Sequence, residues 1–138
     1  MLATDRWPRW NTVGVLHDLA TVSFVPSRDL ARARAFYEGV LGLVVTHEDG
    51  FALVLGHGAG QIRVVAAGDF SSQPFTILGW ETADIDAAVG ALAKAGVDFV
   101  RYEGFDQDAA AIWTAPGGGR VTWFRDPDDN VLSLSSSA

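Results

Sequence analysis

The chain of 138 residues contains no cysteine. This absence excludes disulfide bonds, thiolate nucleophiles and cysteine-ligated metal sites. Long apolar runs are also absent, since none approaches the ~20 residues that a membrane-spanning helix needs. The first residues lack the charged start and apolar middle of a signal peptide. We therefore expect a cytoplasmic protein that does not bind a membrane.

Basic residues are scarce. The sequence has 10 Lys and Arg against 17 Asp and Glu, which gives a net charge of −7. A nucleic-acid-binding protein needs a basic surface to neutralise phosphates, so we expect no nucleic-acid partner. The acid excess is compatible with a cationic ligand, but solubility is the better explanation of it. Hydrophobic residues make up 49% of the chain, which is typical of a globular domain with a sizeable core.

Two segments of the chain repeat one pattern at an offset of 55 residues. Residues 21–43 are TVSFVPSRDLARARAFYEGVLGL, and residues 76–97 are TILGWETADIDAAVGALAKAGV. Each has a short apolar run, then an Asp, then apolar residues at helical spacing, then a Gly. Two copies of one small unit must bury their apolar faces together. We therefore expect a binding site in the trough between them.

Each copy predicts the order βαβββ. Asp29 and Asp84 are expected to cap the two helices, which end near Gly42 and Gly96. Strands are expected near residues 21–25, 43–46, 51–55 and 61–66, and again near residues 75–82, 97–102, 120–125 and 130–134. The fold class is α+β, with an N-terminal arm (1–19) and one domain (20–138) that holds the repeats 20–68 and 74–135. The arm contains Trp7 and Trp10, which are expected to dock on the domain or on a partner subunit.

Three strings carry a resemblance to a known family. They are SRDLARARAFYEGVLGL, TADIDAAVGALAKAGV and GGGRVTWFRDPDDNVLSL. In this order the chain resembles the vicinal oxygen chelate superfamily, which includes glyoxalase I, bleomycin-resistance proteins and extradiol dioxygenases. Asp129 stands where the family's turn usually has Gly, which predicts a turn that is strained or of another type. The resemblance implies a cup-shaped, mixed eight-stranded sheet with helices packed outside, and a homodimer.

Metal-using members of that superfamily hold a divalent ion on the first and fourth strand of each unit, with His, Gln or Glu ligands. The matching positions here are Val22, Arg63, Ile77 and Ser133. Aliphatic side chains cannot bind a metal ion, and a guanidinium is always protonated and would repel it. We therefore expect no metal and no other cofactor. His47 and His57 fall beside predicted turns, where we interpret them as solvated residues. His17 precedes the first predicted strand and is interpreted as a capping or dimer-contact residue.

Strand alternation predicts the lining of the cup. Val22, Phe24, Ile77, Gly79 and Ser133 are expected to face inward, with Arg63. Arg63 would bind an anionic group of a ligand or form an internal ion pair with Glu81 or another acidic residue. The long loop 103–118 is typical of a segment that covers a site, and its Trp113 is the candidate ligand contact.

These features favour a metal-independent small-molecule binding protein of the bleomycin-resistance type, which sequesters an aromatic or amphipathic compound. The charge of that compound stays open, because the acid excess suits a cation and Arg63 suits an anion. The alternative is a lyase or isomerase for a small carbonyl or carboxylate substrate, with or without metal. Glu81 or Asp106 would then be the general base if burial raised its pKa. A third possibility is an accessory domain without a ligand.

Overall fold

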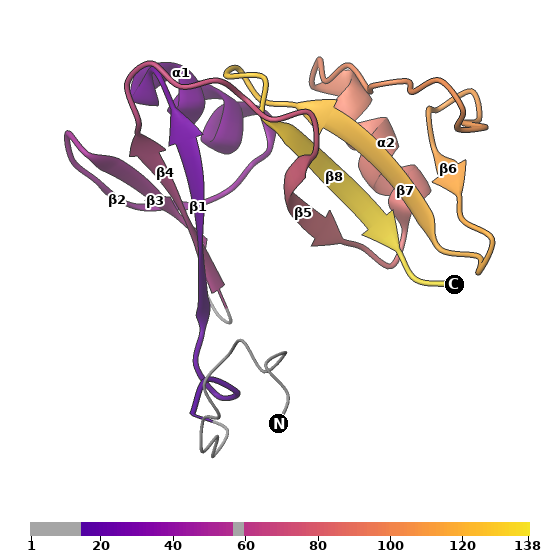
Figure 1. Cartoon of the computed structure of the whole chain (residues 1–138), viewed down its shortest axis with the longest axis horizontal. Helices are drawn as coiled ribbons and strands as arrows, with labels where there is room; N and C mark the ends of the chain where they lie inside the picture. Colours follow the sequence, from indigo (N-terminus) through magenta and orange to yellow (C-terminus); the bar gives the residue numbers. More distant parts are fainter. Residues whose placement is uncertain (1–14, 57–59) are drawn as a thin grey trace, which may run out of the picture.

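A computed structural model describes residues 15–56 and 60–138 (Figure 1). The first repeat folds into one α-helix that continues as a π-helix (η1), together with four strands. The second repeat has one helix and four strands. The elements of the first repeat are β1 (Thr21–Ser27), α1 (Leu30–Arg34), η1 (Ala35–Val40), β2 (Val45–Glu48), β3 (Ala52–Leu55) and β4 (Gly60–Ala66). Those of the second are β5 (Thr76–Glu81), α2 (Ile85–Lys94), β6 (Trp113–Thr114), β7 (Arg120–Arg125) and β8 (Val131–Ser136).

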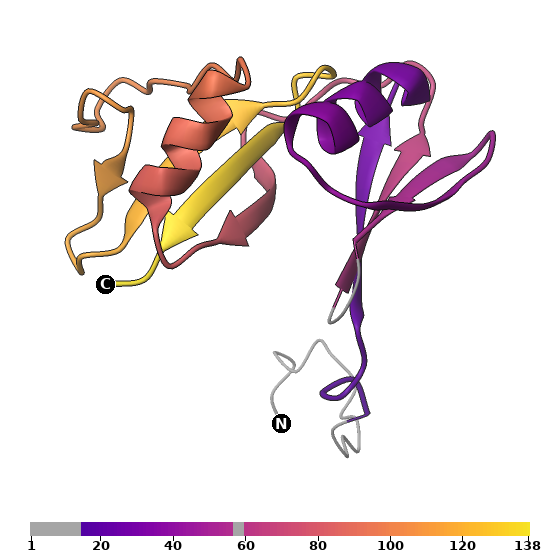
Figure 2. The same cartoon turned by 180° about the vertical axis from the view of Figure 1, so that it is seen from behind.

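The strands form two mixed four-stranded sheets with the same topology. Their orders are β1-β4-β3-β2 and β5-β8-β7-β6, and the first pair of each sheet is parallel. The predicted α+β class and the two βαβββ repeats are confirmed. The eight strands are arranged as four in each sheet, one sheet for each repeat. Both helices lie in front of the strands in Figure 2, so the helix-free faces of the two sheets open on the opposite side.

The helix starts follow the sequence prediction. One carboxylate oxygen of Asp29 accepts from the backbone N–H of Ala31 at 3.0 Å and of Arg32 at 3.2 Å. Asp84 accepts from the backbone N–H of Ala87 at 3.0 Å. Both capping residues are therefore confirmed. No described helix is long and apolar enough to cross a membrane.

The predicted strand at 97–102 is wrong. In this segment Phe99 forms an isolated bridge with Phe124, and the edge position that β2 takes in the first sheet is taken in the second by the short β6 inside the long loop. The reason is the side chain of Gln107. Its amide donates to the carbonyls of Val100 and Ala111 and accepts from the N–H of Tyr102, so it occupies backbone groups that a strand would pair.

The hydrophobic core draws side chains from both repeats. Tyr37, Leu53 and Val64 of the first repeat belong to one cluster with Phe124 and Leu132 of the second. Trp80 stacks on Phe124 with ring centroids 6.4 Å apart and packs against this core. The two repeats therefore share buried surface and do not stand as separate cores.

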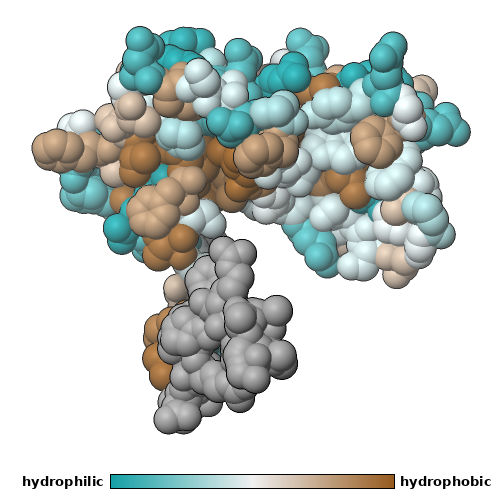
Figure 3. Space-filling view, viewed as in Figure 1, coloured by the Kyte–Doolittle hydropathy of each residue, from teal (hydrophilic) through white to brown (hydrophobic). Residues whose placement is uncertain are grey.

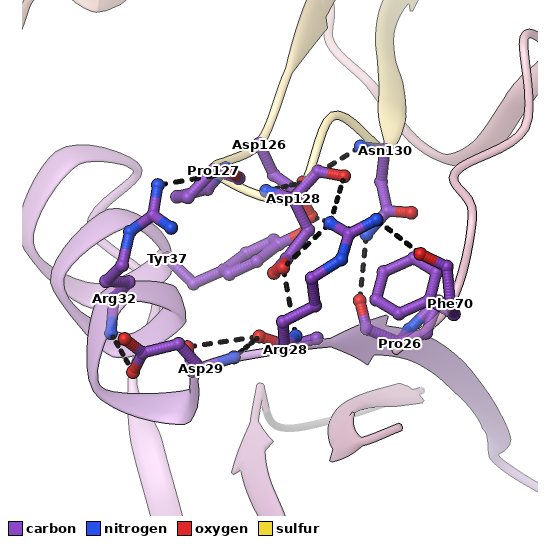
Figure 4. Close-up of polar contacts among 11 residues, drawn as sticks. Pro26, Arg28, Asp29, Arg32, Tyr37, Phe70, Asp126, Pro127, Asp128 and Asn130 are labelled. Atoms are coloured by element: carbon purple, nitrogen blue, oxygen red, sulfur yellow. Dashed lines mark hydrogen bonds and ion pairs between the residues drawn. The ribbon is translucent and has the colours of Figure 1, made fainter. Parts of the chain in front are cut away.

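A buried carboxylate fastens the second repeat to the first (Figure 4). Asp126 is only 4% exposed, and its Oδ2 accepts from the Tyr37 hydroxyl at 2.6 Å and from Asn130 Nδ2 at 2.9 Å. Its Oδ1 accepts from the backbone N–H groups of Asp128 and Asn130. Asn130 Nδ2 also donates to the carbonyl of Pro26 on β1. These hydrogen bonds of Tyr37, Asp126 and Asn130 form one network that joins the two repeats.

The same turn also contacts the linker between the repeats, through Asp128 and Arg28. Asp128 Oδ1 accepts from the backbone N–H of Arg28 at 2.9 Å. The Arg28 guanidinium lies 4.3 Å from the centre of the Phe70 ring and donates to the Phe70 carbonyl. Asp129, in the same turn, has φ +64°, the left-handed conformation that glycine adopts without strain. Of the two outcomes expected for this turn, the positive φ of Asp129 supports a strained turn.

Burial, reinforced by the neighbouring Asp126 carboxylate, raises the pKa of Tyr37 well above its ordinary value of 10.0. The folded protein therefore holds this proton more tightly than the unfolded chain does. The stabilisation is complete below pH 10 and is lost as the pH rises above 10. Tyr37→Phe should cost about 1.5–3 kcal/mol at pH 7, because the Asp126 carboxylate loses a donor.

The same variant should also flatten the alkaline loss of stability. Urea unfolding from pH 8 to 11 should show the wild type losing up to about 1.4 kcal/mol more per pH unit than Tyr37→Phe does above pH 10. Groups that titrate in both proteins cancel in this comparison. Equal slopes would contradict the buried, neutral Tyr37.

Candidate functional site

The first half of the candidate site lies on the helix-free face of the first sheet. Phe24 and Arg63 are register partners across β1 and β4, beside the pair Val22 and Gln61. Phe24 is 61% exposed and Val22 is 40% exposed, which is unusual for large apolar side chains on a sheet. Figure 3 shows that apolar surface gathers mainly over this sheet and toward its junction with the second.

Arg63 is held but not neutralised. Its Nε donates to Gln61 Oε1 at 3.0 Å, and it forms no ion pair with a carboxylate of residues 15–56 or 60–138. Glu81, the partner considered from sequence, instead accepts from the Ser137 hydroxyl at 3.1 Å. The terminal nitrogens of the Arg63 guanidinium are thus on an exposed sheet face, where they can meet an anion.

The second half of the site lies on the helix-free face of the second sheet. Gly79 pairs with Ser133 across β5 and β8. A Cβ at Gly79 would lie 2.4 Å from the Ser133 hydroxyl oxygen, so the strands approach here because residue 79 has no side chain. Ile77 departs from the predicted alternation, since the register shifts between Thr76 and Leu78. Ile77 is half-buried and packs against the core.

Four aromatic side chains cover the rest of this face, and we call them the aromatic cluster: Tyr102, Phe105, Trp113 and Trp123. The Phe105 ring lies 4.9 Å from Trp113 and 5.4 Å from Trp123, measured between centroids. Tyr102 lies 5.3 Å from Trp123. Trp123 is the register partner of Ser133 on β7, so the cluster lies beside the Gly79–Ser133 pair. Sequence reasoning singled out Trp113, whereas the alternation of β7 would also have found Trp123.

Several polar contacts hold the loop that carries Tyr102 and Phe105. Besides the three bonds of Gln107, Asp108 Oδ1 accepts from the N–H groups of Ala110 and Ile112. The Thr122 hydroxyl donates to the carbonyl of Ala111 at 2.9 Å. Arg101 donates to the carbonyls of Asp108 and Ala109. The aromatic rings are therefore positioned before any ligand binds, which lowers the entropy cost of binding.

The residues of this chain do not fit the superfamily's metal site. The four positions hold Val22, Arg63, Ile77 and Ser133, and none offers an imidazole or carboxylate. Within the described ranges, no three His, Asp or Glu side chains gather as metal ligands would. His47 lies 3.1 Å from Asp49 in an exposed turn, and His17 is exposed before β1. His57 lies outside the described residues, as do Trp7 and Trp10.

The two candidate bases are exposed. Glu81 lies at the end of β5, and Asp106 lies in the loop between α2 and β6. A carboxylate becomes a general base at neutral pH when burial or a like charge raises its pKa. Glu81 and Asp106 have no such burial here.

The family model for the glyoxalase/bleomycin resistance protein/dioxygenase superfamily matches residues 17–134. The chain belongs to this superfamily. None of the curated proteins compared with the chain matches it.

Solved structures of the superfamily share its fold. A glyoxalase/bleomycin resistance protein/dioxygenase from Alicyclobacillus acidocaldarius is 17% identical, with a TM-score of 0.66 over 87% of this chain and 92% of its own. A lactoylglutathione lyase from Agrobacterium tumefaciens is 16% identical, with a TM-score of 0.67 over 86% and 93%. A glyoxalase family protein from Bacillus anthracis is 16% identical, with a TM-score of 0.67 over 87% and 94%. At these identities the likeness extends to the fold and not to the chemistry.

The close approach of β5 and β8 at Gly79 can be tested by substitution. Gly79→Ala should destabilise the protein by about 1–3 kcal/mol, because the new methyl group meets the Ser133 hydroxyl. Adding Ser133→Ala should recover most of this loss, since the Ser133 Cβ lies 3.7 Å from the same point. Thermal or urea unfolding of both single variants and the double variant measures this coupling. Additive effects of the two substitutions would contradict the described packing.

Proposed function

We propose that this protein is a metal-independent binding protein for a small aromatic compound with an anionic group. The observation that carries the proposal is the aromatic cluster on the helix-free face of the second sheet. Such rings bind flat apolar molecules through burial and edge or offset stacking. Phe105, which lies between Trp113 and Trp123, is 42% exposed and available for contact.

We infer the anionic group of the ligand from the Arg63 side chain. A guanidinium on an apolar face binds a carboxylate or similar anion bidentately, and its bond with Gln61 leaves both Nη atoms for that role. The net charge of −7 is spread over the chain and favours a cation only at long range, where salt screens it. The local charge of Arg63 therefore favours an anionic ligand over a cationic one.

The binding reading is favoured over a lyase or isomerase. Either reaction needs a base at the site, and Glu81 and Asp106 are exposed in this structure. The donor set also offers no metal ligands that would polarise a carbonyl substrate.

A second copy of the chain is part of this proposal. Val22, Phe24 and Phe51 belong to or border the first sheet and expose 40%, 61% and 82% of their surface. Apolar residues gathered in this way are typical of a protein–protein or ligand contact. A homodimer in which the second sheet of one copy faces the first sheet of the other would cover them. It would also bring Arg63 opposite the aromatic cluster of the partner.

Tryptophan fluorescence during a screen of aromatic carboxylates and aromatic cations tests the binding site. We expect an aromatic carboxylate to quench the emission, and Arg63→Ala to weaken its affinity about 10- to 150-fold, the equivalent of a charged hydrogen bond. Arg34→Ala is the matched control, since Arg34 pairs with Glu38 and Glu48 on the helix side. Unchanged affinity in Arg63→Ala would make Arg63 structural. Quenching by none of the compounds would count against the proposal.

Sedimentation equilibrium tests the dimer. The wild type should sediment as a dimer, and Phe24→Asp should sediment as a monomer, because a charge cannot be buried unpaired in an apolar contact. Ala87→Asp, which places the same charge on an exposed position of α2, should stay dimeric. A monomeric wild type would contradict this part of the proposal.

A further inference from the structure

Arg125, at the end of β7, is exposed and is not neutralised by a carboxylate of the described residues. Six other arginines lie within residues 15–56 and 60–138, and each donates at least one side-chain hydrogen bond. The Arg125 guanidinium forms no hydrogen bond or ion pair within these ranges. It borders two pockets, so solvent reaches it from more than one side. Because a guanidinium stays protonated, Arg125 is available to an anion from outside the chain.

Arg125 lies on the same face of the second sheet as the aromatic cluster. Side chains alternate along β7, and Phe124, which is 1% exposed, belongs to the core. Trp123 and Arg125, on either side of it, therefore point to the helix-free face, with Cα atoms about 7 Å apart. Trp113 pairs with Val121 on the far side of Trp123, so the cluster extends away from Arg125. The guanidinium thus lies at one end of the row of rings.

A pocket of about 330 Å³ lies between Arg125 and the linker that joins the two repeats. Figure 1 shows this linker, between β4 and β5, running past the turn that joins β7 to β8. The pocket is lined by linker and hairpin residues: Ser72, Gln73, Pro74, Arg125, Asp129 and Val131. A guanidinium, a hydroxyl and a carboxamide therefore border one space, and each can donate a hydrogen bond to an anionic group.

Asp129 is the acidic residue of this pocket. It borders the same space as Arg125 but forms no ion pair with it. Asp129 therefore leaves the charge of Arg125 in place, and its carboxylate would repel an anion bound there. This repulsion gives a second way to test the site, because removal of the Asp129 charge should strengthen binding.

We propose that Arg125, with Ser72 and Gln73, forms a second anion subsite beside the aromatic cluster. The inference rests on the proposed function and narrows its ligand to an aromatic compound with two acidic groups. The ring lies on the cluster, one acidic group binds Arg125, and the other binds Arg63. A compound with one acidic group leaves one of the two guanidinium groups without a partner, so the site selects the diacid.

Titration calorimetry with two probes tests this subsite. Naphthalene-2,6-dicarboxylate carries two acidic groups, and naphthalene-2-carboxylate carries one on the same ring system. We expect the wild type to bind the diacid at least about 10-fold more tightly, because the second group gains a charged hydrogen bond. Arg125→Gln should abolish this preference and leave the affinity for the monoacid close to that of the wild type, because Arg63 still binds one group.

Asp129→Asn tests the subsite in the opposite direction. Asn tolerates the left-handed backbone of this turn, so the variant keeps the fold. Its affinity for the diacid should rise about 1.5- to 5-fold, the range for exposed charge pairs. Lys94→Gln is the matched control, since it removes an exposed positive charge from the end of α2 and should change neither affinity. Circular dichroism checks that each variant is folded.

Equal affinity of the wild type and Arg125→Gln for the diacid would overturn the second subsite. If Arg63→Ala still weakened both probes in that case, the proposed function would stand without it. Weaker binding of the diacid to Asp129→Asn would also overturn the subsite, because the carboxylate would then be a contact of the ligand. Binding of neither probe to the wild type would overturn this inference and the proposed function together.

Discussion

The buried carboxylate of Asp126 is the constraint on which the arrangement of this protein depends. An unpaired charge in a protein interior is costly, so its position is set by the donors that surround it. Two of those donors are backbone N–H groups of its own turn, and a third is the Tyr37 hydroxyl of the other repeat. Because Asn130 also reaches the Pro26 carbonyl, the turn before β8 fixes where the second sheet stands relative to β1.

Within this arrangement, the two copies of the repeated unit present two different surfaces. Both repeats place a helix on one face of a four-stranded sheet and leave the other face free. The first free face carries Arg63 among apolar side chains, whereas the second carries the aromatic cluster. The difference comes from the segment between α2 and β7, where the loop adds Tyr102 and Phe105, and β6 adds Trp113, beside Trp123. The fold is that of the superfamily, and the chemistry follows from these added side chains.

Sequence reasoning succeeded where the causes are local. The caps Asp29 and Asp84 act within one turn, and the predicted strand 120–125 matches β7. It failed where distant residues decide. In the 97–102 segment, the Gln107 side chain forms hydrogen bonds with the backbone of Val100 and Tyr102, which a strand would use for pairing. The irregularity at Ile77 depends on the register between β5 and β8. The π-helix η1 holds Tyr37, whose partner Asp126 is 89 residues away. Trp113 and Trp123 could be predicted from the loop and from strand alternation, whereas the contacts of Tyr102 and Phe105 with them depend on how the loop folds onto β7.

The central claim is that an aromatic anion binds here through Arg63 and the aromatic cluster, without a metal ion. Titration calorimetry on protein dialysed against EDTA, and on the same protein with one equivalent of Zn²⁺, Ni²⁺ or Mn²⁺, tests it most directly. We predict one ligand affinity under all four conditions, because Val22, Arg63, Ile77 and Ser133 provide no metal ligands. Binding that is lost on EDTA treatment and restored by a divalent ion would contradict the claim.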